Sequence, residues 1–376
     1  MNALNDTDLP IAEWSERVLM SIVPVSPQLS CALDSPSVWR GAQLEKRGDW
    51  IHHVSAHEVA ELERSVERII ARGLCVPNFG KDDFPLPVFA GVLDRIRENV
   101  VNGPGVHVVR GLPVERWSRE QCAVAYWGIG AHIGEAVTQN AYGHVLGHVK
   151  DIGVDVDDVQ NRGHRSRAAL SYHNDIGGEI IGLFCLKPSK SGGLSSVVSA
   201  GALYDEMLRR RPDLLAELLQ PMYLDRRGEV PEGWKPYYRL PVFSRHEGRL
   251  IVCFVRRFVE SAQRFPELPR LTQAQWDALD MLRDLAASPE FSLDISFDPG
   301  DIQFVNNLTT MHSRTGYEDF SEPDQKRHLL RLWLAVPGGW PLPQAFYDRY
   351  VATTPGGRPS GVVVTDPSEP APMDVA

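Results

Sequence analysis

Two histidines and one aspartate have the types and spacing of a metal site. His173 and Asp175 lie two residues apart, so on an extended segment both side chains leave the same face and reach one ion. His312 comes much later, after a Pro-Gly turn that opens an apolar run. A ferrous centre that takes a co-substrate and dioxygen needs two histidines, one carboxylate and open positions. We predict that these three residues bind one metal ion and carry the catalysis.

Two arginines downstream of His312 are candidates for an anion site beside this ion. Arg327 and Arg331 lie four residues apart, an even spacing that points both guanidinium groups to one face of a strand. The planar fork of a guanidinium suits the far carboxylate of a dicarboxylic acid. A lone His-x-Asp is common by chance and an arginine pair is more often structural, so the two motifs support each other.

Their order along the chain resembles that of the taurine dioxygenase-like (TauD/TfdA) oxygenases, including the clavaminate synthase-like branch, over roughly residues 80 to 340. The matching motifs are, in order, His173-x-Asp175, Leu186-Lys-Pro-Ser-Lys-Ser-Gly-Gly-Leu-Ser195-Ser, Val198-Ser-x-x-x-Leu-Tyr204, Asn306-Asn-x-x-x-x-His312-x-Arg314 and Arg327-x-x-x-Arg331. Each motif is moderately specific, and their common order makes the resemblance strong.

The resemblance implies an α+β protein with a double-stranded β-helix (jelly-roll) core and flanking helices. It implies iron(II) on the three ligands and 2-oxoglutarate chelating the metal through its keto-acid end. Arg327 would hold the distal carboxylate of 2-oxoglutarate with help from the Ser195 hydroxyl. Arg331 would lie near the metal end of this co-substrate or near an anionic substrate group.

The reaction implied is an O2-dependent oxidation of an unactivated C–H bond, coupled to conversion of 2-oxoglutarate to succinate and CO2. Hydroxylation is the leading expectation, and desaturation or ring closure stays open. Because Asp175 stands where halogenating relatives have Gly or Ala, halogenation is disfavoured.

Four residues near the ligands are candidates for substrate contact, although amide and aromatic side chains beside strands are usually packing or turn elements. They are Gln139, Asn140, Tyr142 and Tyr172. Residues 169–172 lack the polar contacts of the taurine enzyme, so taurine itself is disfavoured. Trp333 is expected in the core.

Two alternative functions remain open. A zinc-dependent or cupin-like metalloenzyme would use the same ligands, and a non-catalytic metal-binding protein would keep the fold without the chemistry. A second histidine pair, His144 and His148, has the four-residue spacing of a helical zinc site, but its glycines and valines favour a strand.

Composition narrows the class of protein. The 376 residues predict one large catalytic domain, and a net charge of -10 excludes the basic footprint of a nucleic-acid binder. Three arginine runs, at residues 209–211, 226–227 and 256–257, are typical of solvated faces. Five widely spaced cysteines without a Cys-x-x-Cys pair predict reduced thiols in the cytoplasm. We expect a small-molecule substrate, no membrane segment or signal peptide, and leave a homo-oligomer open.

The elements that must position these residues follow from periodicity. Apolar spacing and N-capping residues predict helices, and short β-branched runs predict strands that form a β-sandwich core. The helices are expected at 56–72, 89–100, 118–129, 200–211 and 273–287, and the strands at 105–110, 250–255, 302–305 and 329–336. We divide the chain into an N-terminal arm (1–50), the oxygenase domain (51–352) and a flexible Pro- and Gly-rich tail (353–376).

Overall fold

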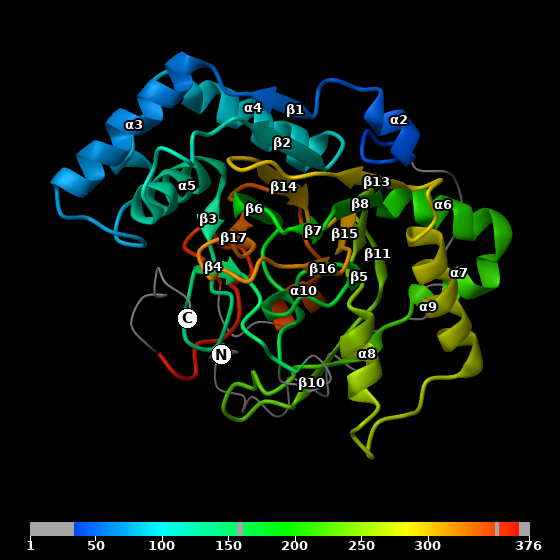
Figure 1. Cartoon of the computed structure of the whole chain (residues 1–376). Coiled ribbons are helices and arrows are strands. Elements are labelled where there is room, and N and C mark those ends of the chain that lie inside the picture. The colour runs from blue at the N-terminus through cyan, green and yellow to red at the C-terminus, as the bar shows by residue number, and fades with distance from the viewer. Residues whose placement is uncertain (1–33, 156–160, 350–352, 368–376) are drawn as a thin grey trace, which may run out of the picture. The chain divides into compact units, whose positions relative to one another are not determined.

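Two β-sheets form the centre of the part of the chain that the computed structural model describes, which is residues 34–155, 161–349 and 353–367. Figure 1 shows the strands gathered between two groups of helices. The larger sheet has the order β1 (Ile51–His53), β2 (Val106–Arg110), β14 (Ile302–Asn306), β6 (Ile180–Lys187), β17 (His328–Ala335) and β3 (Glu135–Ala136), with β4 (Leu146–Val149) also beside β17. The smaller sheet has the order β13 (Ser292–Ile295), β8 (Ser195–Ser199), β15 (Thr310–Arg314) and β5 (Leu170–His173).

The two sheets pack face to face through a shared apolar cluster. Val305 and Trp333 contribute to it from the larger sheet, and Val197 and Leu293 from the smaller one. This two-layered arrangement with helices outside it confirms the predicted α+β jelly-roll core. Three two-stranded pairs complete the strands, namely β7–β16 (Ser191–Gly192 with Tyr317–Glu318), β9–β10 (Met222–Asp225 with Tyr237–Leu240) and β11–β12 (Phe243–His246 with Arg249–Val252).

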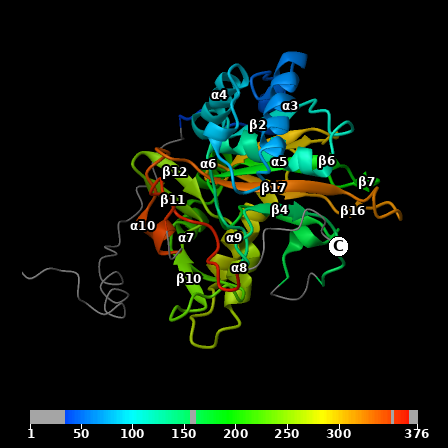
Figure 2. The same cartoon turned by 90° about the vertical axis from the view of Figure 1, so that its left-hand side faces the viewer.

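Three N-terminal helices cover the outer face of the larger sheet. They are α3 (Ala56–Ala71), α4 (Phe89–Asn102) and α5 (Arg119–Ile133), which Figure 2 shows on one side of that sheet. Leu330 and Leu332 of β17 point into this helical layer. Alternation along the strand therefore turns Arg331 and Trp333 inward, toward the smaller sheet. One face of β17 therefore packs against the helices, and the other faces the smaller sheet and carries Arg331 and Trp333.

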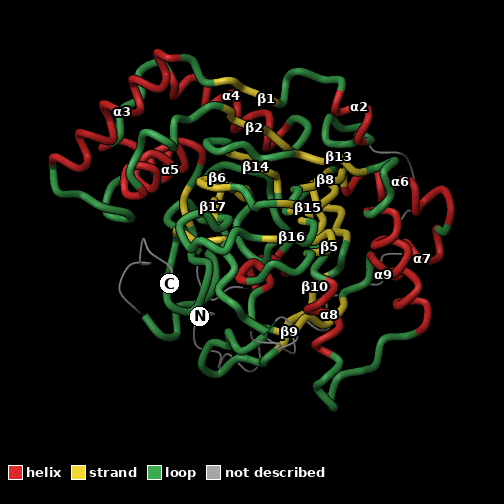
Figure 3. Tube along the Cα trace, viewed as in Figure 1, coloured by secondary structure: helices red, strands yellow, loops and turns green. Residues whose placement is uncertain are grey.

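Helix starts follow the predicted capping chemistry. Ser118 accepts a hydrogen bond from the Gln121 amide at the start of α5, and Thr272 does the same for Gln275 at α9 (Gln273–Ala286). The remaining helices are α2 (Gly41–Glu45), α6 (Ala200–Arg210), α7 (Pro212–Leu218), α8 (Arg256–Ala262) and α10 (Gln344–Asp348), with 3-10 turns η1 (Lys81–Asp83) and η2 (Gly163–Arg165). Figure 3 shows α6, α7 and α9 beside the smaller sheet.

Segments at both ends of the described chain pack onto the sheets. Residues 1–33 of the expected N-terminal arm lie outside the described residues, but Trp39 and Trp50 belong to the core between the sheets. In the expected tail, Arg358 is buried against Glu179, and Val362 joins the same core. No helix among the described residues is long and apolar enough to cross a bilayer.

Candidate metal centre and its cavity

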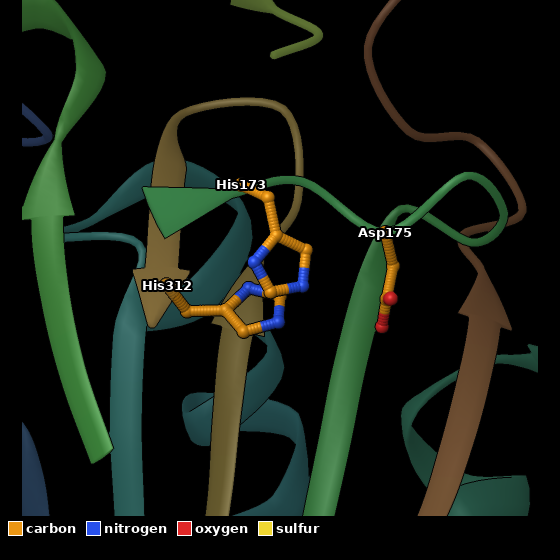
Figure 4. Close-up of side chains that lie close together, drawn as sticks. All are labelled: His173, Asp175 and His312. Carbon is orange, nitrogen blue, oxygen red and sulfur yellow. The ribbon is translucent and has the colours of Figure 1, made fainter. Parts of the chain in front are cut away.

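Pairing between two distant strands brings the predicted ligands together. β5 runs antiparallel to β15, and in that register His173 lies directly opposite His312. The two imidazole ring centroids are 4.4 Å apart. One ligand atom each from His173, His312 and Asp175 lies within 4.8 Å of the others. Figure 4 shows the three side chains gathered on one side of the strands. This separation fits three donors around a single cation.

Asp175 reaches the site through a turn and not through strand alternation. β5 ends at His173, and the Asp175 amide donates to the side-chain oxygen of Asn307 at 2.9 Å. The Asn307 side-chain amide donates back to the Asp175 carbonyl at 2.8 Å. The turn passes close to an indole, since a Cβ atom on Gly177 would lie 2.5 Å from the Trp333 ring. A glycine is therefore needed at that position.

Neighbouring groups orient the ligands. The His173 Nδ1 lies 2.8 Å from the Ser171 carbonyl, which only accepts, so Nδ1 carries the proton and Nε2 keeps its lone pair for a metal. The Trp333 indole donates to one Asp175 oxygen at 2.8 Å. The Arg331 guanidinium forms an ion pair with Asp175 at 3.4 Å.

The charge state of the ligands fits a divalent cation. Burial works against ionisation of Asp175, but the charges of Arg331 and the two histidines, with the Trp333 hydrogen bond, outweigh it and lower the pKa of this carboxyl. Burial, with repulsion from His173, lowers the pKa of His312 to about 3. An ionised Asp175 carboxylate beside a neutral His312 imidazole fits the donor set that iron(II) requires.

The ligands face a cavity of about 240 Å³. Its walls come from both sheets, from the loop before β5 and from α8. Among the described residues, its charged and polar lining comprises Arg162, His164, Ser171, Tyr172, His173, Asn174, Asp175, Ser195, Arg227, Arg256, Arg257, His312, Ser313, Arg314, Arg327 and Arg331. A small-molecule substrate and a co-substrate therefore have a common space beside the ligands.

Two buried arginines in the cavity wall, Arg314 and Arg327, have donors that could bind an anion. Nη1 of Arg327 and both Nε and Nη1 of Arg314 are buried without a hydrogen-bond partner among the described residues. Both guanidinium groups stack on Tyr317. Burial, with repulsion from Arg327, lowers the pKa of Arg314 to about 10. Ser195 also lines the cavity, where its hydroxyl donates to Gln303 at 2.9 Å. Two buried cations with unpaired donors need an anion.

Of the four residues expected to contact substrate, Tyr172 lines the cavity and the other three do not. Gln139 is buried, and its side chain accepts from Arg331 Nε at 2.8 Å and donates to the Arg331 carbonyl at 2.9 Å. It thus positions Arg331. The side-chain oxygen of Asn140 accepts from the Tyr142 amide, closing a local turn, and Tyr142 is exposed on the surface. Both side-chain amides are therefore engaged in contacts within the protein, away from the cavity.

The second histidine pair makes no metal site with the described residues. His148 lies on β4, as the glycines and valines predicted, and its Nδ1 lies 2.8 Å from Nε2 of His328. Among the described residues, His173, Asp175 and His312 are the group whose ligand atoms lie close enough together to hold one metal ion.

Several residues of the site lacked a predicted role. Arg314 stands two residues after His312, and the same even-spacing argument used for the arginine pair finds it. Trp333 is in the core as expected, but it also binds Asp175. The solvated-face prediction is wrong for Arg226 and Arg227, which are both buried.

Comparison with known proteins identifies related sequences and folds. Residues 72–333 match the model of the "Taurine catabolism dioxygenase TauD, TfdA family". FR-33289 synthase of Streptomyces rubellomurinus is 32% identical over 316 residues, covering 82% of this chain and 91% of that protein. A uridine-5'-phosphate dioxygenase of an Amycolatopsis species is 26% identical over 212 residues, covering 50% and 71%. Asparagine oxygenase, solved with Fe(II), hydroxyasparagine and succinate, has the same fold, with a TM-score of 0.58, 15% identity and coverage of 76% and 93%.

Proposed function

Since the chain belongs to the taurine catabolism dioxygenase TauD, TfdA family, we propose that His173, Asp175 and His312 hold the iron(II) of a 2-oxoglutarate-dependent dioxygenase. The enzyme hydroxylates a C–H bond and converts 2-oxoglutarate to succinate and CO2. The observation that carries the residue assignment is the convergence of three ligand atoms within 4.8 Å at the wall of an arginine-lined cavity.

Each residue of the site has a task in this proposal. When bound, iron(II) supplies the redox chemistry that couples dioxygen reduction to oxidation of the co-substrate and the substrate. Arg327 and Arg314 pair with the distal carboxylate of 2-oxoglutarate, and Ser195 lies beside them in the cavity wall. Trp333 and Arg331 hold the Asp175 carboxylate in place.

We propose a small organic molecule as the substrate. The remaining lining of the cavity, with Tyr172 and Ser171 close to the ligands, is available to it. One relative is named as a dioxygenase of uridine-5'-phosphate, which is a small organic molecule, and this supports the proposal. Because a carboxylate completes the ligand set, hydroxylation is favoured over halogenation.

Turnover of 2-oxoglutarate tests the proposal directly. Protein supplied with Fe(II), ascorbate, O2 and 2-oxoglutarate should form succinate, slowly without substrate and faster with it. The chelator EDTA should stop the reaction. Arg327→Met should raise the KM for 2-oxoglutarate roughly tenfold to a hundredfold, since a charge-assisted hydrogen bond is lost. Arg283→Met, on the exposed side of α9, is the matched control.

Two results would favour the rival functions. Activity with Zn(II) that needs no 2-oxoglutarate would indicate a zinc or cupin-like enzyme. Tight binding of 2-oxoglutarate, with no succinate for any of a broad set of small molecules, would indicate a non-catalytic protein.

A further inference from the structure

The Ser195 hydroxyl is tied to a buried glutamine of the opposite sheet. Ser195 on β8 donates to Oε1 of Gln303 on β14 at 2.9 Å. Gln303 is 1% exposed and Ser195 is 4% exposed. Ser195 lines the cavity, whereas Gln303 is not among the lining residues. The glutamine therefore contacts the serine from behind the cavity wall.

Strand alternation turns Gln303 toward the smaller sheet. Phe304, the next residue, belongs to the apolar cluster under the N-terminal helices, whereas Val305 belongs to the cluster between the sheets. In the register of the larger sheet Gln303 is paired with Leu183, and Leu183 is paired with Arg331. Gln303 thus belongs to one inward-facing row with Leu183 and Arg331, which both line the cavity.

Ser195 lies beside the two arginines that are proposed to bind 2-oxoglutarate. β8 pairs with β15 so that Ser195 stands directly opposite Arg314. A Cβ atom on Gly193, two residues before Ser195, would lie 3.2 Å from Nε of Arg327. Ser195, Arg314 and Arg327 all line the cavity. The serine hydroxyl is therefore placed to reach the same carboxylate as the two guanidinium groups.

The direction of the Ser195 hydrogen bond is unsuited to a carboxylate. A hydroxyl has one hydrogen, and here it goes to Gln303, so Ser195 turns only lone pairs toward the cavity. An ionised carboxylate also only accepts hydrogen bonds. Because two acceptors that face each other repel, Ser195 can bind the distal carboxylate only if its hydrogen turns into the cavity.

The other end of the Gln303 amide indicates how the hydrogen is released. Nε2 of Gln303 is buried and has no hydrogen-bond partner among the described residues. A buried donor without a partner is unfavourable. A half-turn of the amide exchanges its two ends, so that Nε2 donates to the Ser195 oxygen and one acceptor, in place of two donors, is left unpaired. The Ser195 hydrogen then points into the cavity.

We propose that Gln303 is a positioning residue for the co-substrate: with 2-oxoglutarate bound, its amide nitrogen donates to Ser195, and Ser195 donates to the distal carboxylate. This inference rests on the proposed function. The charge of the carboxylate favours this direction along the chain of hydrogen bonds, because a hydrogen bond to an ionised acceptor is stronger than one to an amide oxygen.

Anaerobic binding of two keto acids to the Fe(II)-loaded protein tests the proposal. 2-Oxoglutarate has the distal carboxylate, and 2-oxovalerate has a methyl group in its place on a chain of the same length. The charge-transfer absorption of each complex follows the titration. Ser195→Ala should weaken 2-oxoglutarate binding roughly tenfold to a hundredfold, because a hydrogen bond to a charged group is lost. Gln303→Met, which keeps the size of the side chain, should weaken it roughly threefold to tenfold.

Two comparisons separate this role from a merely structural one. The affinity for 2-oxovalerate should stay within about twofold of the wild type in both variants, since the lost contact serves the distal carboxylate. In the double variant, Gln303→Met should add no loss to that of Ser195→Ala, because Gln303 acts through Ser195.

Ser196→Ala is the matched control. Ser196 is the next residue on β8, donates to the Leu293 carbonyl at 3.3 Å and does not line the cavity. This variant should bind both keto acids as the wild type does.

The sign of the change distinguishes the two directions of the hydrogen bond. If Ser195 keeps donating to Gln303 when 2-oxoglutarate is bound, Gln303→Met frees the serine hydrogen, and the affinity stays the same or rises. That result, an unchanged affinity in Ser195→Ala, or an equal loss for both keto acids would overturn the inference, while an intact charge-transfer band leaves the dioxygenase assignment standing.

A second variant covers the case in which Gln303→Met gives no band with either keto acid. Gln303→Asn keeps a polar amide that is too short to reach Ser195, and it should weaken 2-oxoglutarate binding but not 2-oxovalerate binding. Absence of the band from the wild-type protein would instead contradict the proposed function itself.

Discussion

At the scale of single residues, the site depends on a hydrogen bond that no motif contains. In the proposed site, Asp175 would be an effective ligand because Arg331 and Trp333 hold its carboxylate and lower its pKa. Partners of this kind fix the direction of a ligand's lone pairs. Periodicity correctly placed Trp333 in the core, but burial alone gives no indication that its indole faces a carboxylate.

Trp333→Phe tests this contact. Phenylalanine keeps most of the packing but removes the donor, so the affinity for Fe(II) should fall roughly tenfold to a hundredfold. Equilibrium dialysis of the anaerobic protein measures the change. Trp340→Phe is the control, since the Trp340 indole donates to Asn102 at 2.8 Å and does not line the cavity. Equal affinity in the Trp333 variant and the wild type would show that the indole does not orient the ligand.

At the scale of elements, sequence predicted the helices better than the pairing of strands. The starts of α5 and α9 follow from Ser118 and Thr272, because capping and apolar spacing are local properties. The register that sets His173 opposite His312 joins distant segments, and no local signal contains it. β17 also has a register irregularity between His328 and Leu329, so simple alternation does not describe its start.

The gathering of arginines in the cavity was out of reach for the same reason. Arg162, Arg227 and Arg257 come from three segments whose contacts arise only in the folded chain. Short arginine runs on the surface are common, so the runs at 226–227 and 256–257 gave no reason to expect burial. The convergence of His173, Asp175 and His312 was predictable because their residue types are restrictive, whereas the arginine lining of the cavity was not.

Glu206 on α6 provides a pH test at this scale. Its carboxylate binds Arg209 and Arg210 on the same helix and Arg40 at the start of α2, 3.3 Å away. The hydrogen bond from Arg209 is the largest influence and lowers the pKa of Glu206. Burial opposes this change, but Arg210 adds to it, and the pKa falls to about 2. Because the pKa is lower in the folded state than in the unfolded state, where it is about 4.3, the ionised carboxylate stabilises the fold at pH values above about 4.3. This stabilisation is lost as the pH falls toward about 2.

Glu206→Gln should therefore lower the free energy of unfolding by about 1–2 kcal/mol at pH 7, after allowance for solvent screening of the exposed arginines. The gap between variant and wild type should narrow as the pH drops from about 5 to about 3. Urea unfolding at several pH values measures it. Glu217→Gln on α7 is the control, and a gap that does not depend on pH would contradict the ion-pair account.

At the scale of the whole described domain, the C-terminal segment belongs to the fold. Arg358 donates to Glu179 with Nε at 2.8 Å, and it also donates to the Trp340 carbonyl. Glu179 in turn accepts from the Val336 amide at the end of β17. Both charged side chains are less than a tenth exposed. The proline- and glycine-rich composition from residue 353 predicted a flexible tail. Composition cannot show that one arginine of this segment forms a buried ion pair with a distant glutamate.

Arg358→Met should destabilise the protein by about 3–5 kcal/mol, because it leaves the buried Glu179 carboxylate without its partner. Chemical denaturation measures the loss. Arg283→Met provides the contrast, since its ion pairs with Asp280 and Asp284 are exposed and are worth at most about 1 kcal/mol. A loss for Arg358→Met no larger than that of the control would show that residues 353–367 contribute little to the fold.

The most direct test of the account is the visible charge-transfer band that forms when Fe(II) and 2-oxoglutarate are added to the protein without oxygen. The wild type should show the band at one iron per chain, and His173→Ala and His312→Ala should each abolish it. His246→Ala, on the β11–β12 pair, should leave it unchanged. An undiminished band and normal succinate formation in either His173→Ala or His312→Ala would remove that histidine from the site and contradict the assignment.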